Sequence, residues 1–368
     1  MIRSIKCLFI AALISTVGSG ISAQTADWQK GAPASWMQVL ERARSEGKVI
    51  VGGPEALAKP MAEAFKRDTG VNLEYLGGSS RDLSARLNRE ARAKSLTIDL
   101  MLGGGSELLT LYPEKLLEAI KPQLMLPTVT GPENWIDGKL KWMDKEEAYF
   151  FQGSNWVFGW AVVNPTLVPQ GTLRTWKDLL KPQFQGKIVA FDPRSGGPGQ
   201  AAANYLAEQF GPDYLKALFA DQRTVYTRDG RQLVEWIARG SYAIGLGAVA
   251  SDIELFRSQG IRTMYIPDLE DGPGSLLGGF SVIKQPVGAP HPNASTVFLN
   301  WYASQPGQTV FSRVMLEPSL RVDVSTDNMP DYIKPKQGLS YIDQYVGDWY
   351  LNTRPQLDKI VTQTLGGP

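Results

Sequence analysis

Residues 71–106 read VNLEYLGGSSRDLSARLNREARAKSLTIDLMLGGGS, and this stretch contains the pattern that decides the fold. An apolar-rich run (71–76) ends in a Gly- and Ser-rich turn (77–80), and an amphipathic run typical of a helix (81–94) follows. A second apolar run (98–102) ends in another such turn, GGGS. Strands that alternate with helices in this way predict a parallel α/β sheet with helices on its faces.

The same strand–turn–helix unit recurs on both sides of this stretch. Upstream, a strand is predicted at 48–51 and a helix at 56–67. Downstream, strands are predicted at 187–191, 224–227 and 242–246, each followed by a turn and a helix. Because the units fall into two groups along the chain, we predict an α/β fold with two lobes.

Two further apolar stretches are predicted to cross between the lobes. The run 156–163 (WVFGWAVV) predicts one long buried strand, and 278–283 (GGFSVI) predicts another. The tail 293–368 is predicted to be mostly helical and to pack on the first lobe. The predicted organisation is a signal peptide (1–23), a discontinuous lobe 1 (24–158 and 276–368) and lobe 2 (159–275).

The first 23 residues have the features of a secretory signal peptide. Arg3 and Lys6 precede an apolar run of ten residues (8–17), and small residues lead to a predicted cleavage after Ala23. A membrane-spanning helix needs about 20 apolar residues, so this run is too short to serve as one. Cleavage removes Cys7, and we therefore expect a thiol-free exported protein that suits an oxidising compartment.

The composition excludes several classes of function. The 368 residues include one cysteine and one histidine, which excludes a disulfide scaffold, a Cys–His nucleophile and zinc sites built from Cys and His. Lys and Arg total 38 against 37 Asp and Glu, a net charge of +1. Such a balance does not favour a nucleic-acid groove or a polybasic membrane surface. We expect no cofactor and no metal.

Three motifs could indicate an enzyme, but each also has a structural interpretation. His291 lies between two prolines, a poor place for the mobile imidazole of a catalytic triad. The run 245–250 (GLGAVA), with Asp268 and Glu270 roughly 20 residues further on, matches a dinucleotide fingerprint, but the predicted helix after it is short. The acidic stretch 144–147 is typical of a solvated surface. A secreted carboxylate-based hydrolase or a nicotinamide oxidoreductase remains the alternative function.

The stronger signal is the density of serine and glycine at helix starts. These turns all follow the carboxyl ends of predicted parallel strands, where open α/β sheets bind ligands, and a helix N-terminus offers unpaired N–H groups and partial positive charge. Neighbouring arginines could add bidentate hydrogen bonds, and Trp156 could face the cleft. We predict that a small, anionic solute binds between the lobes; a sugar remains possible because tryptophans are plentiful. The predicted ligand-binding residues are Ser79, Ser80, Arg81, Gly105, Ser106, Trp156, Arg194, Ser195, Gly196, Gly197, Arg228 and Asp229.

Four stretches of the chain resemble the periplasmic solute-binding proteins of ABC importers, in the group that includes iron(III)- and phosphonate-type binding proteins. The resemblance implies a type II periplasmic binding protein fold with two crossover strands, a membrane permease as partner and no enzymatic activity. We also expect a monomer. The stretches that carry the resemblance are 48–80, 98–106, 161–188 and 278–294.

The resemblance also implies which residues contact the ligand. They are Ser79, Ser80, Ser106, Asn155, Ser195 and Gly196. Iron(III)-binding members carry adjacent tyrosines after the strand that corresponds to 242–246, whereas here 247–251 reads GAVAS. This departure disfavours iron and leaves a small carboxylate, phosphonate or sulfonate as the favoured solute. An importer and a sensor both remain possible roles.

Overall fold

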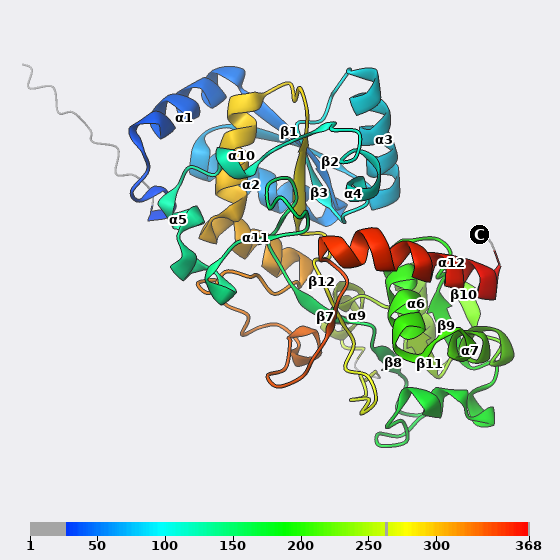
Figure 1. Ribbon diagram of the computed structural model, residues 1–368. Coiled ribbons are helices and arrows are strands. Elements are labelled where there is room, and N and C mark those ends of the chain that lie inside the picture. Colours follow the sequence, from blue (N-terminus) through cyan, green and yellow to red (C-terminus); the bar gives the residue numbers. More distant parts are fainter. Residues whose placement is uncertain (1–26, 262–263, 367–368) are drawn as a thin grey trace, which may run out of the picture.

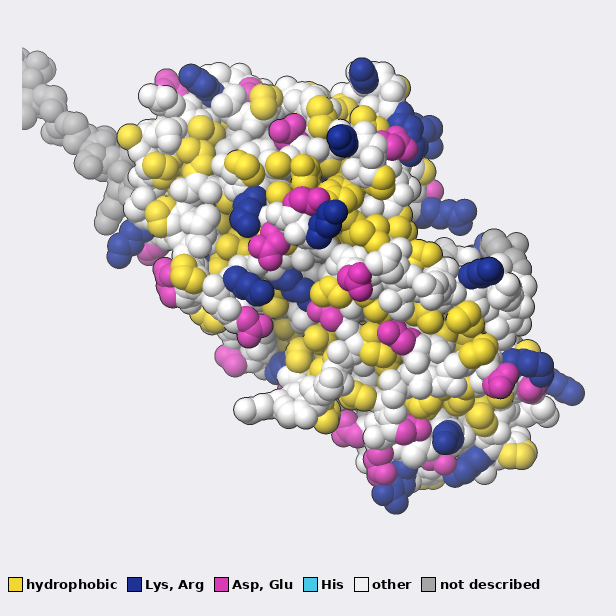
Figure 2. Space-filling view, in the orientation of Figure 1, with side chains coloured by type: hydrophobic (Ala, Val, Ile, Leu, Met, Phe, Trp, Pro, Cys, Tyr) yellow, Lys and Arg dark blue, Asp and Glu magenta, His cyan; other side chains and the backbone are white. Residues whose placement is uncertain are grey.

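The computed structural model describes residues 27–261 and 264–366, and the predicted signal peptide lies outside them. Two α/β lobes are connected by a small central sheet (Figure 1). In the described part of the chain, no helix has the length and apolar character that a membrane crossing requires. Figure 2 shows acidic and basic side chains interspersed on the face in view, in agreement with the near-zero net charge.

The first lobe is built on a mixed sheet with the strand order β2-β1-β3-β13-β6-β5, and β4 pairs with β13. β1, β2 and β3 are parallel, as predicted, whereas β13 runs antiparallel to β3. The parallel strands therefore end at one edge of the sheet, where their Gly- and Ser-rich turns lie. The strands are β1 (Lys48–Gly53), β2 (Asn72–Gly77), β3 (Leu100–Gly103), β4 (Leu117–Glu118), β5 (Lys141–Trp142), β6 (Phe151–Gln152) and β13 (Val282–Pro286).

Helices cover both faces of this sheet (Figure 1). The amphipathic pattern of α2 buries Met61 and Phe65, and Gly70 ends the helix in the left-handed conformation that glycine favours. Phe65 packs edge-on against Phe298 and Trp301 of α10. The helices of this lobe are α1 (Ala34–Glu46), α2 (Ala58–Thr69), α3 (Ser80–Ala93), α4 (Glu107–Thr110), α5 (Pro127–Thr130), α10 (Pro292–Ala303) and α11 (Gln305–Met315).

The second lobe is built on a sheet with the order β10-β9-β11-β8, in which β8 is antiparallel to β11. β9, β10 and β11 are parallel and lie where the sequence predicted them. Their carboxyl ends lead into α6, α8 and α9. The elements are β8 (Ala161–Val163), β9 (Ile188–Phe191), β10 (Val225–Thr227), β11 (Ile244–Leu246), α6 (Gly197–Phe210), α7 (Pro212–Leu215), α8 (Gly230–Ala238) and α9 (Ala250–Ser258).

The two connections between the lobes differ from the predicted strands. The expected continuous strand 156–163 is broken into β7 (Trp156–Phe158) and β8, because Gly159 has φ +90°. A Cβ at Gly159 would lie 2.9 Å from the Tyr205 ring of α6. The second connection is likewise split into β12 (Ser275–Leu277) and β13, with a turn at 278–281 between them. β12 pairs with β7 and with β14 (Ile342–Asp343), which forms the central sheet.

The C-terminal segment does not all pack on the first lobe, contrary to the prediction. α10 and α11 do so, but α12 (Arg354–Leu365) packs against α6 and α7 of the second lobe (Figure 1). Asn204 of α6 donates a 2.8 Å hydrogen bond to Asp358, and Trp349 donates one of 2.8 Å to Glu208. Tyr350 belongs to an apolar cluster that includes residues of both lobes.

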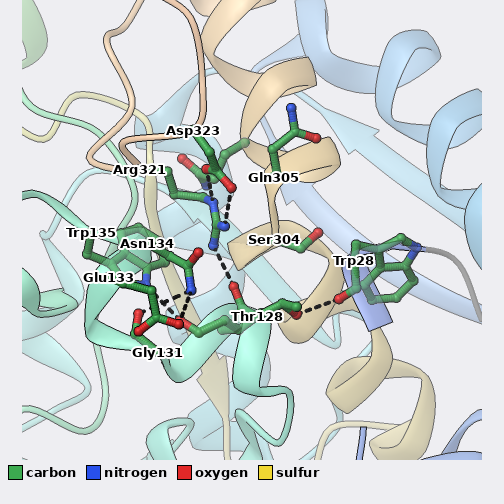
Figure 3. A network of polar contacts seen from close by, with 12 residues as sticks. Trp28, Thr128, Gly131, Glu133, Asn134, Trp135, Ser304, Gln305, Arg321 and Asp323 are labelled. Atoms are coloured by element: carbon green, nitrogen blue, oxygen red, sulfur yellow. Dashed lines mark hydrogen bonds and ion pairs between the residues drawn. The ribbon is translucent and has the colours of Figure 1, made fainter. Parts of the chain in front are cut away.

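A buried arginine ties distant segments of the first lobe together (Figure 3). The Arg321 side chain is 2% exposed and forms a bidentate pair with Asp323 at 2.7 and 2.8 Å. Its Nη1 donates to the carbonyls of Thr128 and Ala303, both at 3.0 Å. The guanidinium also lies 5.2 Å from the centre of the Trp135 ring.

Replacing Arg321 with Met should lower the free energy of unfolding by about 2–3 kcal/mol, because it leaves the carbonyls of Thr128 and Ala303 without this donor. Urea denaturation would measure the loss. Asp323→Asn is the matched control, because Asp323 is 40% exposed and a partly solvated pair contributes about 1 kcal/mol or less. Equal effects of the two variants would contradict this account.

Candidate functional site

The predicted turns of the first lobe lie at the carboxyl edge of its sheet, but most of their polar groups have partners. The Ser79 hydroxyl accepts from Asp82 N at 3.2 Å and donates to the Asp82 carboxylate at 2.7 Å, so it caps α3. Ser80 is the first residue of α3, and the Arg81 side chain is exposed on it. Ser79 therefore acts as an ordinary N-cap of α3.

The turn after β3 is covered by other parts of the chain. Gly105 is buried, and a Cβ there would lie 2.4 Å from Met143 Cε and 3.5 Å from Tyr350 Cζ. The Ser106 hydroxyl lies 3.0 Å from that of Ser84. The sequence analysis predicted that the C-terminal segment packs on the first lobe but did not place it on this turn. The hydrogen-bond donors of the turn after β3 are consequently less accessible to a solute than we predicted.

A single carboxylate, that of Asp192, pairs with both predicted arginines of the second lobe. It pairs with Arg194 at 2.8 Å and with Arg228 at 3.1 Å, and Arg194 also lies over the Tyr226 ring at 4.9 Å. Burial acts to raise the pKa of Asp192, but the hydrogen bonds and the charge of Arg194 hold that pKa below its usual value. Both arginines thus have a carboxylate partner, which sequence reasoning missed although Asp192 belongs to the same turn.

The other predicted residues of the second lobe act at helix starts. The Ser195 hydroxyl donates to the Asp192 carbonyl at 2.8 Å. Gly196 and Gly197 have φ +81° and +67°, and they lead into α6. Asp229 caps α8 by accepting from the N–H groups of Arg231 and Gln232.

The residues that could have indicated an enzyme form hydrogen bonds and ion pairs within the fold. His291 Nδ1 lies 2.8 Å from the buried Asp99 carboxylate, which also accepts from His291 N, as expected for a structural histidine. The expectation of a wholly solvated acidic stretch is wrong for Asp144, which is 3% exposed and accepts three backbone N–H bonds. Asp268 and Glu270 pair with Lys336 and Arg174, at 2.6 Å each.

A group of buried polar atoms lies where the first lobe passes into β7. Within the described residues, Gln152 Oε1, Asn155 Oδ1 and Trp156 Nε1 are buried without a hydrogen-bond partner. Asn155 and Trp156 were predicted from the sequence, and Gln152 was not. Buried polar atoms are rarely left without partners, so such a group indicates a place where a further ligand or solvent completes the bonding.

Trp156 lines a small pocket between the two lobes, here called the interlobe pocket. Its volume is about 20 Å³. The second lobe contributes the start of α9, and the first lobe contributes the end of α11, the residues after it and Phe280. The lining residues are Trp156, Val249, Ala250, Ser251, Phe280, Met315, Leu316 and Glu317.

The start of α9 faces this pocket. α9 follows β11 and Gly247, which has φ +78° and lies close to Phe191 and α6. Val249 occupies the N-cap position, and no described side chain caps the helix there. The first helical bond runs from Asp252 N to Val249 O at 3.2 Å, so the N–H groups of Ala250 and Ser251 precede it. The GLGAVA motif thus leads into a helix start that favours anions.

Glu317 supplies a carboxyl group to the same pocket. Its side chain is 3% exposed, accepts from Ser154 Oγ at 2.9 Å, and accepts from Phe280 N at 3.2 and 3.3 Å. Burial raises the pKa of Glu317 to about 8, against the opposite effect of these hydrogen bonds. The group is therefore mostly protonated at neutral pH, and the sequence analysis did not single it out.

A larger pocket, of about 250 Å³, lies beside the crossover connections and not between the predicted turns. Val157, Trp160 and Tyr341 are among the residues that form its wall. At its rim Asp268 and Lys336 pair with each other. We place the candidate site in the interlobe pocket instead, because Trp156, whose buried Nε1 has no described partner, and the start of α9 both line it. Among the described residues, no group of three or more His, Cys, Asp or Glu side chains could hold a metal ion.

Comparisons with known proteins support the same fold. No curated protein sequence matches the chain. AfuA from Actinobacillus pleuropneumoniae, solved with bound fructose-6-phosphate, has a TM-score of 0.67 and 18% identity, and the match covers 86% of this chain and 98% of that one. Apo ferric ion-binding protein A from Pasteurella haemolytica has a TM-score of 0.68 and 15% identity, with 88% and 99% covered. An ABC-transporter substrate-binding protein from Agrobacterium tumefaciens has a TM-score of 0.68 and 18% identity, with 86% and 94% covered.

At these identities the structural likeness shows the fold alone, which is the predicted type II periplasmic binding protein fold. The family is shown by the sequence itself. The model of the family described as bacterial extracellular solute-binding protein matches residues 60–334, which is most of the chain. The match includes the start of α9, Trp156 and Glu317. On this ground the chain belongs to the bacterial extracellular solute-binding proteins, the substrate-binding components of ABC transporters.

Proposed function

We propose that this protein captures a small anion in the interlobe pocket and delivers it to the permease of an ABC importer. The observation that carries the proposal is the buried Trp156 Nε1, which has no hydrogen-bond partner among the described residues and belongs to a side chain that lines the pocket together with the start of α9. An indole N–H can only donate, so its natural partner is an acceptor such as an oxyanion. The uncapped start of α9 favours the same charge.

The hydrogen bonds available in the pocket can account for the affinity that a solute-binding protein needs. Micromolar affinity corresponds to roughly 8 kcal/mol. A hydrogen bond to a charged group contributes about 1.5–3 kcal/mol, and a helix end in a partly buried site up to about 2 kcal/mol. Bonds from Trp156, Ala250 and Ser251 to one anion would therefore supply most of what a binding protein needs. A phosphorylated sugar, as bound by AfuA, is one anion of this class.

Entry of a solute requires the lobes to separate. A volume of about 20 Å³ accommodates little more than one water molecule. The pocket walls come from different lobes that are joined by two connections, so a hinge motion at Gly159 and at 278–281 would widen it. We propose that the protein works in the periplasm as a monomer, with 159–275 moving as the second lobe.

Replacing Trp156 with Phe should weaken anion binding at least tenfold, because the ring is kept while the N–H donor is lost. Isothermal titration of the mature protein with sulfate, phosphate, methylphosphonate, acetate and citrate would measure this loss for every anion that binds. Trp28→Phe is the matched control, because Trp28 also has a buried Nε1 with no partner among the described residues but lies in the first lobe away from the pocket. Absence of binding for the whole series would refute the proposal, and so would equal losses in the two variants.

A further inference from the structure

Glu317 lies in the interlobe pocket in an unusual position for a carboxylate. It follows Leu316, which has φ +53°, directly after the end of α11. The carboxyl oxygens share the N–H of Phe280, and Oε2 also accepts from Ser154 Oγ. Oε1 therefore has one long contact and retains capacity for a further hydrogen bond. The adjoining Gly279 has φ +53°, and a Cβ there would lie 2.3 Å from Oε1.

The surroundings of Glu317 do not stabilise a negative charge. No Lys, Arg or His of the described ranges forms an ion pair with Glu317. The charge of Glu317 would act on two phenols, those of Tyr302 of α10 and Tyr345 of the C-terminal segment. Burial is the larger cause that raises the pKa of both phenols, and it keeps them neutral. Lys284 of β13 is paired with Glu107 at 3.0 Å. Burial without a cation favours the protonated acid.

We propose that Glu317 is a specificity-determining residue whose carboxylic acid proton is donated to the bound anion, beside the N–H of Trp156. This inference rests on the proposed function, since it assigns a role within the same pocket. A protonated carboxyl is a donor, so the pocket would present an O–H, an indole N–H and helix N–H groups to one acceptor. Loss of that proton replaces a donor with a negative charge that repels the anion.

The proposal gives each class of solute its own pH dependence. Anion binding weakens as the pH rises through about 8, because binding requires the protonated Glu317. A cation would show the opposite trend, since it would bind the ionised carboxylate. A neutral sugar would show little change. The direction of the pH dependence therefore separates the three classes.

The test is titration with sulfate, whose charge is constant between pH 6 and pH 9, at fixed ionic strength. The affinity of the natural protein should fall about tenfold from pH 6 to pH 9, the change expected when one proton with a pKa of about 8 is required. Glu317→Gln keeps a neutral donor at every pH, so its affinity should not change over this range. Asp252→Asn is the control and should retain the tenfold fall, because Asp252 is another carboxyl whose pKa is raised by burial.

A measurement without ligand separates the two proposals. Infrared difference spectra between pH 6 and pH 9 should show one protonated carboxyl in the natural protein that Glu317→Gln lacks. Sulfate binding that is independent of pH, or a fall that Asp252→Asn removes, would overturn the role of Glu317 and leave the proposed function standing. The carboxyl signal without binding of any of the five anions at pH 6 would overturn both the proposed anion capture and the role assigned to Glu317.

Discussion

Replacing Lys284 with Met should lower the free energy of unfolding by about 3–5 kcal/mol, one of the two largest effects expected in this protein. Lys284 and Glu107 are both fully buried, and Lys284 Nζ lies 3.0 Å from Glu107 Oε2. Lys284 also donates to the Gly104 carbonyl at 2.5 Å, which holds the turn after β3. The Met side chain fits a buried strand position but leaves Glu107 as an unpaired charge.

The double variant Lys284→Met with Glu107→Gln is the control, because it removes both charges and should recover much of the loss. Urea denaturation at pH 7 would measure all three proteins. Burial alone would raise the pKa of Glu107, but the charge of Lys284 and the hydrogen bond from Ser84 lower it. The stability gained from the pair is therefore present at neutral pH and lost on acidification. A loss below about 1 kcal/mol for Lys284→Met would show that the pair contributes little.

Replacing Glu317 with Gln should raise the free energy of unfolding at alkaline pH. The gain should be roughly 3–5 kcal/mol larger than any change that the same replacement causes at pH 4. The pKa of Glu317 is about 8 in the folded protein and near the ordinary value of 4.5 in the unfolded chain. Below pH 4.5 both states are protonated, so the group has no effect on stability. As the pH rises toward 8, the unfolded chain releases the proton while the folded protein retains it, and the folded state loses stability. Above pH 8 both states are ionised and the loss is constant.

Denaturation curves at pH 4, 6, 8 and 9 would measure this difference between the natural protein and the variant. The gap between their free energies of unfolding should widen between pH 4 and pH 8 and then remain constant. Asp327→Asn, on an exposed loop, should leave the pH profile of the natural protein unchanged. Parallel profiles for Glu317→Gln and the natural protein would contradict the burial effect assigned to Glu317.

Much of the fold could be predicted because its signals are local. A β-branched run followed by glycines and an amphipathic helix is encoded within about 25 residues, and β1, β2, β3, β9, β10 and β11 lie where such runs predicted them. The break at Gly159 was missed, because the sequence of an apolar run does not show whether its glycine adopts a positive φ. The position of α12 could not be predicted either. An amphipathic pattern shows that a helix packs on something but not on which lobe.

The site was only partly predictable for the same reason. Trp156 and Asn155 were predicted from their place at the start of a crossing strand and from the family resemblance, and both have buried polar atoms without a described partner. Arg194 and Arg228 were expected to face a solute, but the carboxylate that pairs with both of them, Asp192, required the fold to bring Arg228 beside it. Glu317 lies in an irregular segment, where no periodicity marks a residue as buried.

Because α12 packs on α6, the hinge motion that we propose would carry α12 with the second lobe, although α12 follows elements of the first lobe in the sequence. A pair of fluorescent dyes on α1 and α12 would therefore span both bodies, and energy transfer between them would follow the angle between the lobes directly. A pair on α6 and α12 would remain within one body and serve as the internal reference. α12 is thus an attachment point for an optical sensor of the proposed solute.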